Sequence, residues 1–331
     1  VEMMPKSTVG DEESIFHVKK GKLTTKKRKK STRDAKKTAM WSVRDNQALG
    51  MRMKNQRVET LVAGVSCGKG TKHDPIQIPL RAVPNSTDCF HCPIGIDVCS
   101  CMEIEEVLSQ ALHKVYATTT FRRQHAYGRH PLNSKSVLPV FVTRILRLLG
   151  VQKGRDVFWD LGCGIGSVVI QAALQGIDAV GIDIQSENIE IAEETWKKVR
   201  SMWKACHPNQ AVGTIQFIKG CMFKELRAIE AGTLSCAPQN LYPTKIWMSN
   251  QLFTPHMNLQ LADLMTSLDS VKSVASMHDI YPHERPGITQ KRNPEPYKKF
   301  TSMKDYLTQK NALEWSATEE RLFYVYSAAL N

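Results

Sequence analysis

The chain has 331 residues, of which 42% are hydrophobic, and this is enough for a buried core and for one or two domains. It contains no run of 18 apolar residues without a charge, and its first residues, VEMMPKSTVGDEES, lack the apolar run of a secretory signal. The composition therefore excludes a wholly unfolded chain, and we expect neither a membrane-spanning nor an exported protein.

The formal net charge of +13 is concentrated near the start of the sequence. Residues 1–60 contain 16 Lys and Arg against 7 Asp and Glu, whereas residues 61–331 contain 29 against 25. Between Lys19 and Lys37 there are 11 basic residues and one acid. Such a segment cannot bury enough apolar surface to fold alone, and its charges attract nucleic-acid phosphates. We predict that residues 1–60 form a disordered basic tail that binds DNA or directs nuclear import, with a merely solubilising tail as the alternative.

Nine cysteines without a secretory signal indicate reduced thiols rather than a disulfide framework. Five of them precede residue 102, in a segment over residues 61–101 that Gly and Pro interrupt repeatedly, so we expect irregular chain there. The pairs Cys89-x-x-Cys92 and Cys99-x-Cys101 resemble a zinc-ligand pattern, but the second pair is spaced more closely than is usual. Ordinary reduced cysteines are the favoured interpretation, with zinc as the alternative, and no metal site is predicted.

Residues 102–150 are predicted to form a small helical lobe. In residues 102–116 apolar residues recur at three- and four-residue spacing, which predicts an amphipathic helix. A second helix is predicted after Pro131, capped by Asn133 or Ser134 and ending at Gly150. The residues expected to face inward are Ile104, Val107, Leu108, Ala111, Leu112, Val115, Val137, Leu138, Val140, Phe141, Ile145, Leu146 and Leu149.

After Gly150, short apolar runs alternate with helical segments, which is the pattern of a doubly wound sheet of parallel strands. The predicted buried strands are 157–161, 179–183, 215–218 and 245–248, and the predicted helices are about 167–176 and 186–204. Further strand-like runs occupy 271–276 and 322–328, and the later one is expected to close the sheet as an antiparallel strand or hairpin. We therefore predict an α/β fold for residues 151–331.

A glycine-rich turn follows the first predicted strand. The sequence DLGCGIGS, from Asp160 to Ser167, places glycines where a ligand can approach the backbone, although a tight turn alone is the alternative. The serine at position 167 breaks the dinucleotide fingerprint, which favours a nucleoside ligand without a pyrophosphate. Asp183 ends the next strand, where a carboxylate can accept hydrogen bonds from both hydroxyls of a ribose. Together these features predict an S-adenosyl-L-methionine site, in which Asp160 helps to hold the cationic methionine end.

Four segments resemble the Dot1 (disruptor of telomeric silencing) class of non-SET histone lysine methyltransferases. They are Ala126-Tyr127-Gly128, the stretch from Asp160 to Gln171, the stretch from Ser249 to Phe253, and Trp315 together with the run from Phe323 to Tyr326. The similarity covers residues 102–331. It implies the Rossmann-like, doubly wound fold of class I S-adenosylmethionine-dependent methyltransferases, preceded by the small helical lobe.

The resemblance also implies roles for individual residues. Carried over by position, the cofactor-binding residues are Tyr127, Gly128, Asp160, Gly162, Gly164, Gly166, Ser167, Asp183, Cys221, Met222 and Asn250. Asp183 replaces the usual Glu, and Cys221 and Met222, or Met222 and Phe223 if one residue is inserted, replace an Asp and a Phe near the adenine. The catalytic set, which would lie beside the reacting methyl group and line an aromatic channel that favours a neutral lysine amine, is Asn250, Phe253, Trp315, Phe323 and Tyr324. Core packing is the alternative for the aromatic residues.

The function implied by the resemblance is that of a nuclear histone-lysine N-methyltransferase. Its substrate would be a lysine on the globular core of histone H3 in nucleosomes, with the segment from Lys19 to Lys37 bound to DNA. An RNA or DNA methyltransferase is one alternative, but Asn250 is followed by Gln-Leu-Phe instead of the Pro-Pro-aromatic sequence that accompanies adenine amino-methylation. A non-catalytic chromatin-binding module is the other alternative, because Arg129 and Ser249 depart from the sequence of the class.

Overall fold

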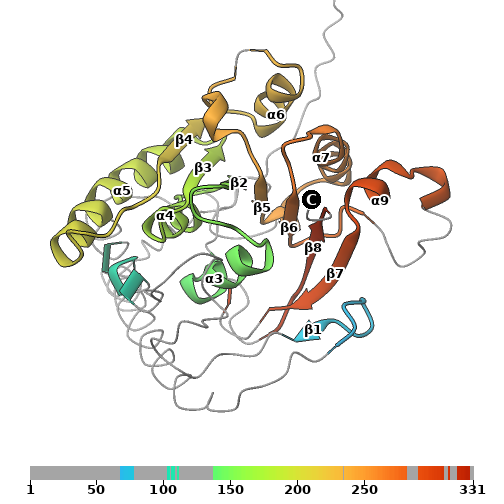
Figure 1. Ribbon diagram of the computed structural model, residues 1–331, viewed down its shortest axis with the longest axis horizontal. Helices are drawn as coiled ribbons and strands as arrows, with labels where there is room; N and C mark the ends of the chain where they lie inside the picture. Colours follow the sequence, from blue (N-terminus) through green and yellow to red (C-terminus); the bar gives the residue numbers. More distant parts are fainter. Residues whose placement is uncertain are drawn as a thin grey trace, which may run out of the picture. The chain divides into compact units, whose positions relative to one another are not determined.

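The computed structural model describes residues 68–77, 103–104, 106–108, 110–111, 137–233, 235–281, 290–308, 312–313 and 319–328. The strands in these ranges are β1 (Ile76–Gln77), β2 (Val157–Leu161), β3 (Asp178–Asp183), β4 (Ile215–Lys219), β5 (Lys245–Met248), β6 (Ser273–Ser276), β7 (Ser302–Leu307) and β8 (Leu322–Ser327). They form one eight-stranded sheet in the order β1-β7-β8-β6-β5-β2-β3-β4 (Figure 1).

The order of the strands creates a switch point at the carboxyl end of β2. Adjacent strands in the series β4-β3-β2-β5-β6 run parallel to each other, whereas β8 is antiparallel to both β6 and β7. The neighbours of β2 are β3 on one side and β5 on the other, and Asp160 lies opposite Gly181 and Trp247 in these two strands. In open α/β sheets a ligand crevice forms where connections leave a strand in opposite directions, so this edge is where a site is expected.

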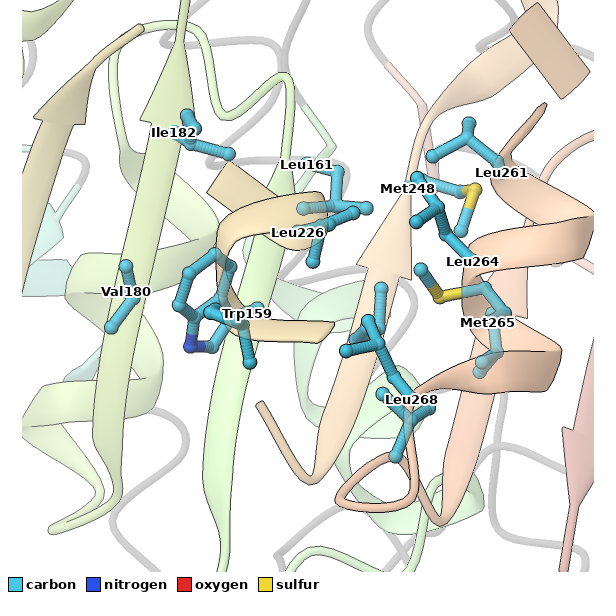
Figure 2. Packing of buried hydrophobic residues seen from close by; sticks show 14 of the residues in the cluster. Trp159, Leu161, Val180, Ile182, Leu226, Met248, Leu261, Leu264, Met265 and Leu268 are labelled. Atoms are coloured by element: carbon cyan, nitrogen blue, oxygen red, sulfur yellow. The ribbon is translucent and has the colours of Figure 1, made fainter. Parts of the chain in front are cut away.

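Helices lie on both faces of the sheet (Figure 1). They are α3 (Pro139–Leu148), α4 (Ser167–Leu174), α5 (Ser186–Cys206), α6 (Met222–Glu230), α7 (Pro255–Ser267) and α9 (Glu295–Lys299), with 3₁₀ turns at Gln239–Leu241 and Asn250–Leu252. Successive side chains of β2 point to opposite faces, so Phe158 packs with α3 and α4, while Trp159 and Leu161 pack with α6 and α7 (Figure 2). Because each fully buried side chain of this size contributes about 1.5–3 kcal/mol, the two layers hold the strand ends in a fixed arrangement.

A helical segment of the predicted lobe packs against the outer side of this layer. All the described residues between positions 103 and 111 are helical. Ile104, Leu108 and Ala111 are buried in a cluster with residues of α4 and α5, including Trp203. The predicted amphipathic helix is therefore confirmed at these positions, and Leu112 and Val115 lie outside the described residues.

The predicted strands and helices of the sheet region are confirmed. The runs at 157–161 and 245–248 coincide with β2 and β5, and those at 179–183 and 215–218 lie within β3 and β4. The helices predicted at 167–176 and 186–204 are α4 and α5, with ends that differ by two residues. The late run is β8, which closes the sheet in the antiparallel direction as expected.

The predicted start of the second helix is wrong. Neither Asn133 nor Ser134 caps it: α3 begins at Pro139, and its N-cap is Leu138, whose side chain makes no capping hydrogen bond. Proline suits the first helical position because its missing N–H would have no helical partner there, and it keeps the preceding residue extended. The N–H of Leu138 donates instead to the carbonyl of Ala312 at 2.9 Å.

Five elements have no counterpart in the sequence prediction: α6, α7, α9, β1 and β7. In β7 the sequence SMKDYL places the buried Asp305 in the middle of the strand, which breaks the apolar pattern. The short β1 pairs in parallel with β7, in a segment that was expected to be irregular. Among the described residues, no helix combines the length and the hydropathy that crossing a membrane requires.

Candidate functional site

A cavity of about 330 Å³ opens at the carboxyl ends of β2, β3, β4 and β5. Its walls come from the glycine-rich turn after β2, the end of β3, the turn between β4 and α6, and the turn after β5. The residues that line it are Val137, Asp160, Gly162, Cys163, Gly164, Ile165, Ser167, Val168, Ile182, Asp183, Ile184, Gln185, Gly220, Cys221, Met222, Phe223, Trp247, Ser249, Leu252, Phe253 and Met257. The switch point of the sheet therefore contains a cavity large enough for a small ligand.

The glycine-rich turn is folded so that its backbone faces the cavity. Gly162, Gly164 and Gly166 have φ values of 84°, 54° and 77°, a left-handed region that strongly favours glycine. A Cβ added to Gly162 would lie 3.5 Å from the ring of Phe253, so the turn and this aromatic ring face each other. Gly166 is the N-cap of α4, and its conformation lets the chain enter the helix directly after the turn.

Asp183 fastens the turn to the start of α5. Its Oδ2 accepts a hydrogen bond from the N–H of Gly164 at 2.9 Å, and its Oδ1 accepts one from the N–H of Gln185 at 2.8 Å. Asn188 donates a third hydrogen bond from Nδ2 to Oδ1 at 3.2 Å. The carboxylate thus holds together two of the elements that form the cavity wall.

Asp160 presents an uncompensated carboxyl group to the same cavity. The residue is only 2% exposed, and within the described part of the chain no group donates a hydrogen bond to its side chain. Burial raises the pKa of the Asp160 carboxyl well above its ordinary value, and the charge of Asp183 raises it further. Burial and the charges of both aspartates also raise the pKa of the Cys163 thiol, which keeps it protonated. A cationic ligand group would compensate the buried charge, so the site fits a ligand with a positive end.

Part of the cavity lining is apolar. Ile184, directly after Asp183, lines the cavity and is 62% exposed. Cys221, Met222 and Phe223 line the cavity from the turn between β4 and α6. These side chains offer apolar surface for a flat ring, and none of them has a carboxylate or an amide to bind the polar edge of that ring.

The structure brings most of the described candidate residues to the cavity. Those that line it are Asp160, Gly162, Gly164, Ser167, Asp183, Cys221, Met222 and Phe253. Gly166, the N-cap of α4, does not line it. Tyr127, Gly128 and Trp315 lie outside the described residues, as do the basic segment from Lys19 to Lys37 and the cysteines from Cys89 to Cys101.

Asn250 lies behind the cavity wall and does not line it. It is fully buried, and its Nδ2 donates to Asn258 Oδ1 at 2.8 Å and to the carbonyl of His278 at 3.3 Å. Its Oδ1 accepts a hydrogen bond from the N–H of His278 at 2.8 Å. These bonds tie the end of β5 to α7 and to the chain after β6, so Asn250 positions the turn that presents Phe253.

Phe323 and Tyr324 are also away from the cavity. The ring of Phe323 is fully buried, and it packs edge-on against Phe141 at 5.0 Å and stacks on Tyr306 at 5.4 Å. Tyr324 points to the other face of the sheet, where it packs on the cluster that contains Trp159. These contacts correspond to core packing, the alternative that the sequence left open for the aromatic residues.

Several lining residues were not among the predicted site residues, although Ser249 and Leu252 lie in the stretch that resembles the Dot1 class. Ile184 and Gln185 follow Asp183 directly, Ser249 and Leu252 follow β5, and Val137 comes from the chain before α3. For the four residues that follow β3 and β5, the available signal was their place just after the carboxyl end of a parallel strand, where ligands bind. Among the described residues no group of His, Cys, Asp and Glu side chains could hold a metal ion.

Comparison with known proteins identifies the family. The family profile "Histone methylation protein DOT1" matches residues 135–327. A protein of Emericella nidulans named "Histone-lysine N-methyltransferase, H3 lysine-79 specific" is 26% identical over 187 residues, which cover 54% of this chain and 34% of that protein. A protein of the same name from Dictyostelium discoideum is 28% identical over 185 residues, covering 54% of this chain and 9% of that protein.

The chain spans about a third of the length of the Emericella relative. Among solved structures, an RNA methyltransferase of Salinibacter ruber in complex with S-adenosyl-L-homocysteine superposes with a TM-score of 0.36 and 18% identity, over 58% of this chain and 92% of that one. The family profile matches more than half of the sequence, and its residues include the whole glycine-rich turn and seven of the eight described strands. The fold is thus that of a Rossmann-like class I methyltransferase, and the chain belongs to the histone methylation protein DOT1 family.

Proposed function

We propose that the cavity binds S-adenosyl-L-methionine and that the chain is a methyltransferase. The observation that supports this most strongly is Asp160, a buried carboxyl group without a hydrogen-bond donor among the described residues, at the switch point of the sheet. S-adenosyl-L-methionine has an ammonium group and a sulfonium centre, either of which would compensate this charge.

The residues of the cavity fit the parts of this cofactor in order. Asp160 and the glycine-rich turn would hold the methionine end, and Asp183 would bind the ribose. Ile184, Met222 and Phe223 would enclose the adenine between apolar surfaces. The cofactor supplies an electrophilic methyl group on a sulfonium sulfur.

The remaining contribution of the chain is to orient the acceptor and to exclude water from it. Phe253, which lines the cavity next to Gly162, is the described aromatic residue best placed to pack against the stem of a lysine. A dry, apolar entrance favours the neutral form of the amine, which is the nucleophile, and positioning it near the methyl group lowers the entropic part of the barrier. We propose that Asn250 acts indirectly, by holding the turn that presents Phe253.

The proposed substrate is a lysine on the globular core of histone H3 in nucleosomes. This rests on the family and on relatives that are named as H3 lysine-79 specific enzymes. The segment from Lys19 to Lys37, with 11 basic residues and one acid, would bind nucleosomal DNA and would favour a nuclear location.

The test is transfer of a labelled methyl group from S-adenosyl-L-methionine to nucleosomes, free histones, RNA and DNA in parallel assays. Gly164→Arg places a large side chain in the cavity, and Gly154→Arg is the matched control, because Gly154 has a similar φ of 72° with no atom within 4 Å of an added Cβ. We expect label on histone H3 of nucleosomes with the wild type and Gly154→Arg, and none with Gly164→Arg. Label on RNA or DNA would overturn the proposal that histone H3 is the substrate. Cofactor binding without methyl transfer to any acceptor would indicate a non-catalytic module.

A further inference from the structure

A tight backbone turn immediately precedes β1. It occupies residues 68–75, and the N–H groups of residues 69–71 all donate to the carbonyl of Asp74, at 3.0, 2.9 and 3.2 Å. The N–H of Asp74 donates in return to the carbonyl of Thr71 at 3.0 Å. The turn is therefore held closed by hydrogen bonds of its own backbone.

Two glycines fix the shape of this turn. Gly68 and Gly70 have φ values of 110° and 78°, in the region that favours glycine. A Cβ added to Gly68 would lie 2.1 Å from the carbonyl oxygen of Pro75, so the two ends of the turn are in contact. A side chain at Gly68 would force the turn to change its shape.

The turn is docked on the edge of the sheet. The carbonyl of Gly70 accepts a hydrogen bond from the N–H of Asp305 in β7 at 3.1 Å. A Cβ added to Gly70 would lie 3.2 Å from the aliphatic stem of Lys304, and β1 continues the contact by pairing in parallel with Tyr306 and Leu307 (Figure 1). The turn is thus a fixed part of the sheet edge.

The exposed side chains of this edge are mostly basic. Lys69, Lys72 and His73 of the turn and Lys304 of β7 are all exposed, and we call these four residues the basic turn surface. Asp74 is the acidic residue of the turn. Among the described residues, neither Lys69 nor Lys304 forms an ion pair with a carboxylate. The surface therefore carries an excess of positive charge that an anionic partner would compensate.

We propose that the basic turn surface binds the phosphate backbone of nucleosomal DNA, as a contact separate from the basic segment between Lys19 and Lys37. The inference rests on the proposed function. In the sheet, β7 is four strand spacings from β2, or about 19 Å at about 4.8 Å per spacing, so a large substrate can reach the cavity and the turn at once. A turn that is rigid before binding loses little conformational entropy in the complex.

Protection of the sheet edge is the alternative role for these charges. Lysines on an edge strand oppose pairing with another chain, and this would account for Lys304. It would not account for a glycine-dependent turn that holds Lys69 and Lys72 beyond the strand. The two roles differ in their effect on DNA affinity, which can be measured.

Substitution of the lysines tests the contact. One variant of the full chain combines Lys69→Gln, Lys72→Gln and Lys304→Gln. The matched control removes the same charge from three exposed lysines elsewhere, by combining Lys153→Gln, Lys197→Gln and Lys204→Gln. Affinity for nucleosomes and for a free DNA duplex is measured for each protein at several salt concentrations.

We expect the first variant to bind both DNA and nucleosomes about tenfold more weakly or worse, with a logarithmic salt slope smaller by about 2–3, because each lost phosphate contact lowers the slope by about 0.9. The control should keep a slope within about 0.5 of the wild type. Equal effects of the two variants would show that only total charge matters and would overturn the inference. A loss with nucleosomes alone would also overturn it, because the surface would then contact acidic residues of histones.

Substitution of Gly68 tests whether the fixed shape of the turn matters when every charge is kept. Gly68→Ala should lower the salt slope by about 1 or more, as for loss of at least one phosphate contact. Gly232→Ala is the matched control, because Gly232 has a φ of 62° and no atom within 4 Å of an added Cβ. A wild-type slope for Gly68→Ala would overturn the assignment of DNA binding to this turn.

The affinity for S-adenosyl-L-homocysteine separates this inference from the proposed function. It should be unchanged in every variant, which also shows that each variant is folded. If the wild type transfers no methyl group to any acceptor, the proposed function fails. If the wild type methylates histone H3 but all variants share its salt slope, the inference alone is overturned.

Discussion

Asp160, the penultimate residue of β2, and Asp183, the last residue of the adjacent parallel strand β3, line one cavity, and burial together with the charge of Asp183 holds the pKa of Asp160 well above its ordinary value. The two carboxyl groups are held differently. Asp183 accepts three hydrogen bonds, whereas within the described residues Asp160 accepts none. One group therefore shapes the cavity, and the other is left for a ligand with a positive charge.

The raised pKa of Asp160 should make the cofactor-free protein less stable as the pH rises. In the unfolded chain an aspartate has a pKa of about 3.9, so above this pH the folded state binds more protons at this site than the unfolded state. Stability then falls with rising pH until the folded-state pKa is passed. Asp160→Asn should therefore melt at a higher temperature than the wild type at pH 7, with a difference that shrinks toward pH 4. If the wild type were more stable than Asp160→Asn at pH 7, this would contradict the conclusion that the Asp160 carboxyl group is uncompensated in the cofactor-free protein.

Gly166 should tolerate a side chain less well than a glycine with the same backbone conformation elsewhere. An added Cβ would lie 2.6 Å from the ring of Phe217 and 2.8 Å from Ala192, whereas at Gly154 nothing lies within 4 Å. Both positions have φ above 70°, so alanine costs about 1–2 kcal/mol of backbone strain at each. We expect Gly166→Ala to lose about 1–3 kcal/mol more than Gly154→Ala in urea unfolding, because of overpacking. Equal losses would mean that strain alone matters at Gly166.

Lys299 should stabilise the end of α7. Its ammonium group donates hydrogen bonds to the carbonyls of Met265, Thr266 and Leu268, which lie at the carboxyl end of this helix. Lys299→Met keeps the apolar stem but leaves these carbonyls without this donor, at an expected cost of about 1–3 kcal/mol in free energy of unfolding. The neighbouring Lys298 forms an exposed ion pair with Glu295, so Lys298→Met should cost less than about 1 kcal/mol. The capping role would be refuted by similar unfolding free energies for the two variants.

Substitution of Phe323 should lower stability without changing cofactor affinity, whereas substitution of Phe253 should mainly lower methyl transfer. Phe323 is fully buried in the layer with α3 and α4, so Phe323→Ala is expected to cost about 3–5 kcal/mol of stability. The affinity of the folded variant for S-adenosyl-L-homocysteine should not change. Phe253→Ala should lower methyl transfer about tenfold with a smaller loss of stability, because this ring lines the cavity and is only half-buried. A variant at position 323 that is stable but inactive would instead place this ring in the lysine channel.

The sequence was most informative where apolar runs and special backbone conformations coincide. Strands β2, β3 and β5 are buried and mostly apolar because helices cover both faces, and the turn after β2 needs left-handed backbone that glycine provides. The strand β7 was not predictable because Lys304 and the buried Asp305 interrupt its pattern. The helix α7 packs against α6 and α9 as well as against the sheet, so its apolar residues do not follow one simple stripe.

The candidate site was predictable for the same reason, but only in part. Asp160 and Asp183 could be placed because the carboxyl ends of parallel strands meet at one edge. The sequence could not show that the side-chain amide of Asn250 forms hydrogen bonds with Asn258 and His278, because only the fold brings these partners to it. Nor could it show that Phe323 and Tyr324 pack in the core and not beside the cavity, because their neighbours come from distant parts of the chain.

The basic segment should contribute to nucleosome binding through counterion release. Deletion of residues 1–40 is expected to weaken nucleosome affinity and to flatten its dependence on salt, because each lost phosphate contact lowers the logarithmic slope by about 0.9. Affinity for S-adenosyl-L-methionine should not change. Binding to nucleosomes measured at several salt concentrations checks this, and an unchanged slope would remove the segment from the mechanism.

The most direct test of the account is the affinity of the full chain for S-adenosyl-L-methionine, measured by calorimetry for the wild type, Asp160→Asn and Asp269→Asn. Asp269 is an exposed residue after α7, outside the cavity, and serves as the matched control. The account predicts a loss of about tenfold or more for Asp160→Asn, as for removal of a charged partner, and a change within about twofold for Asp269→Asn. Equal affinity of the wild type and Asp160→Asn would contradict the assignment of the buried carboxyl group to the cofactor.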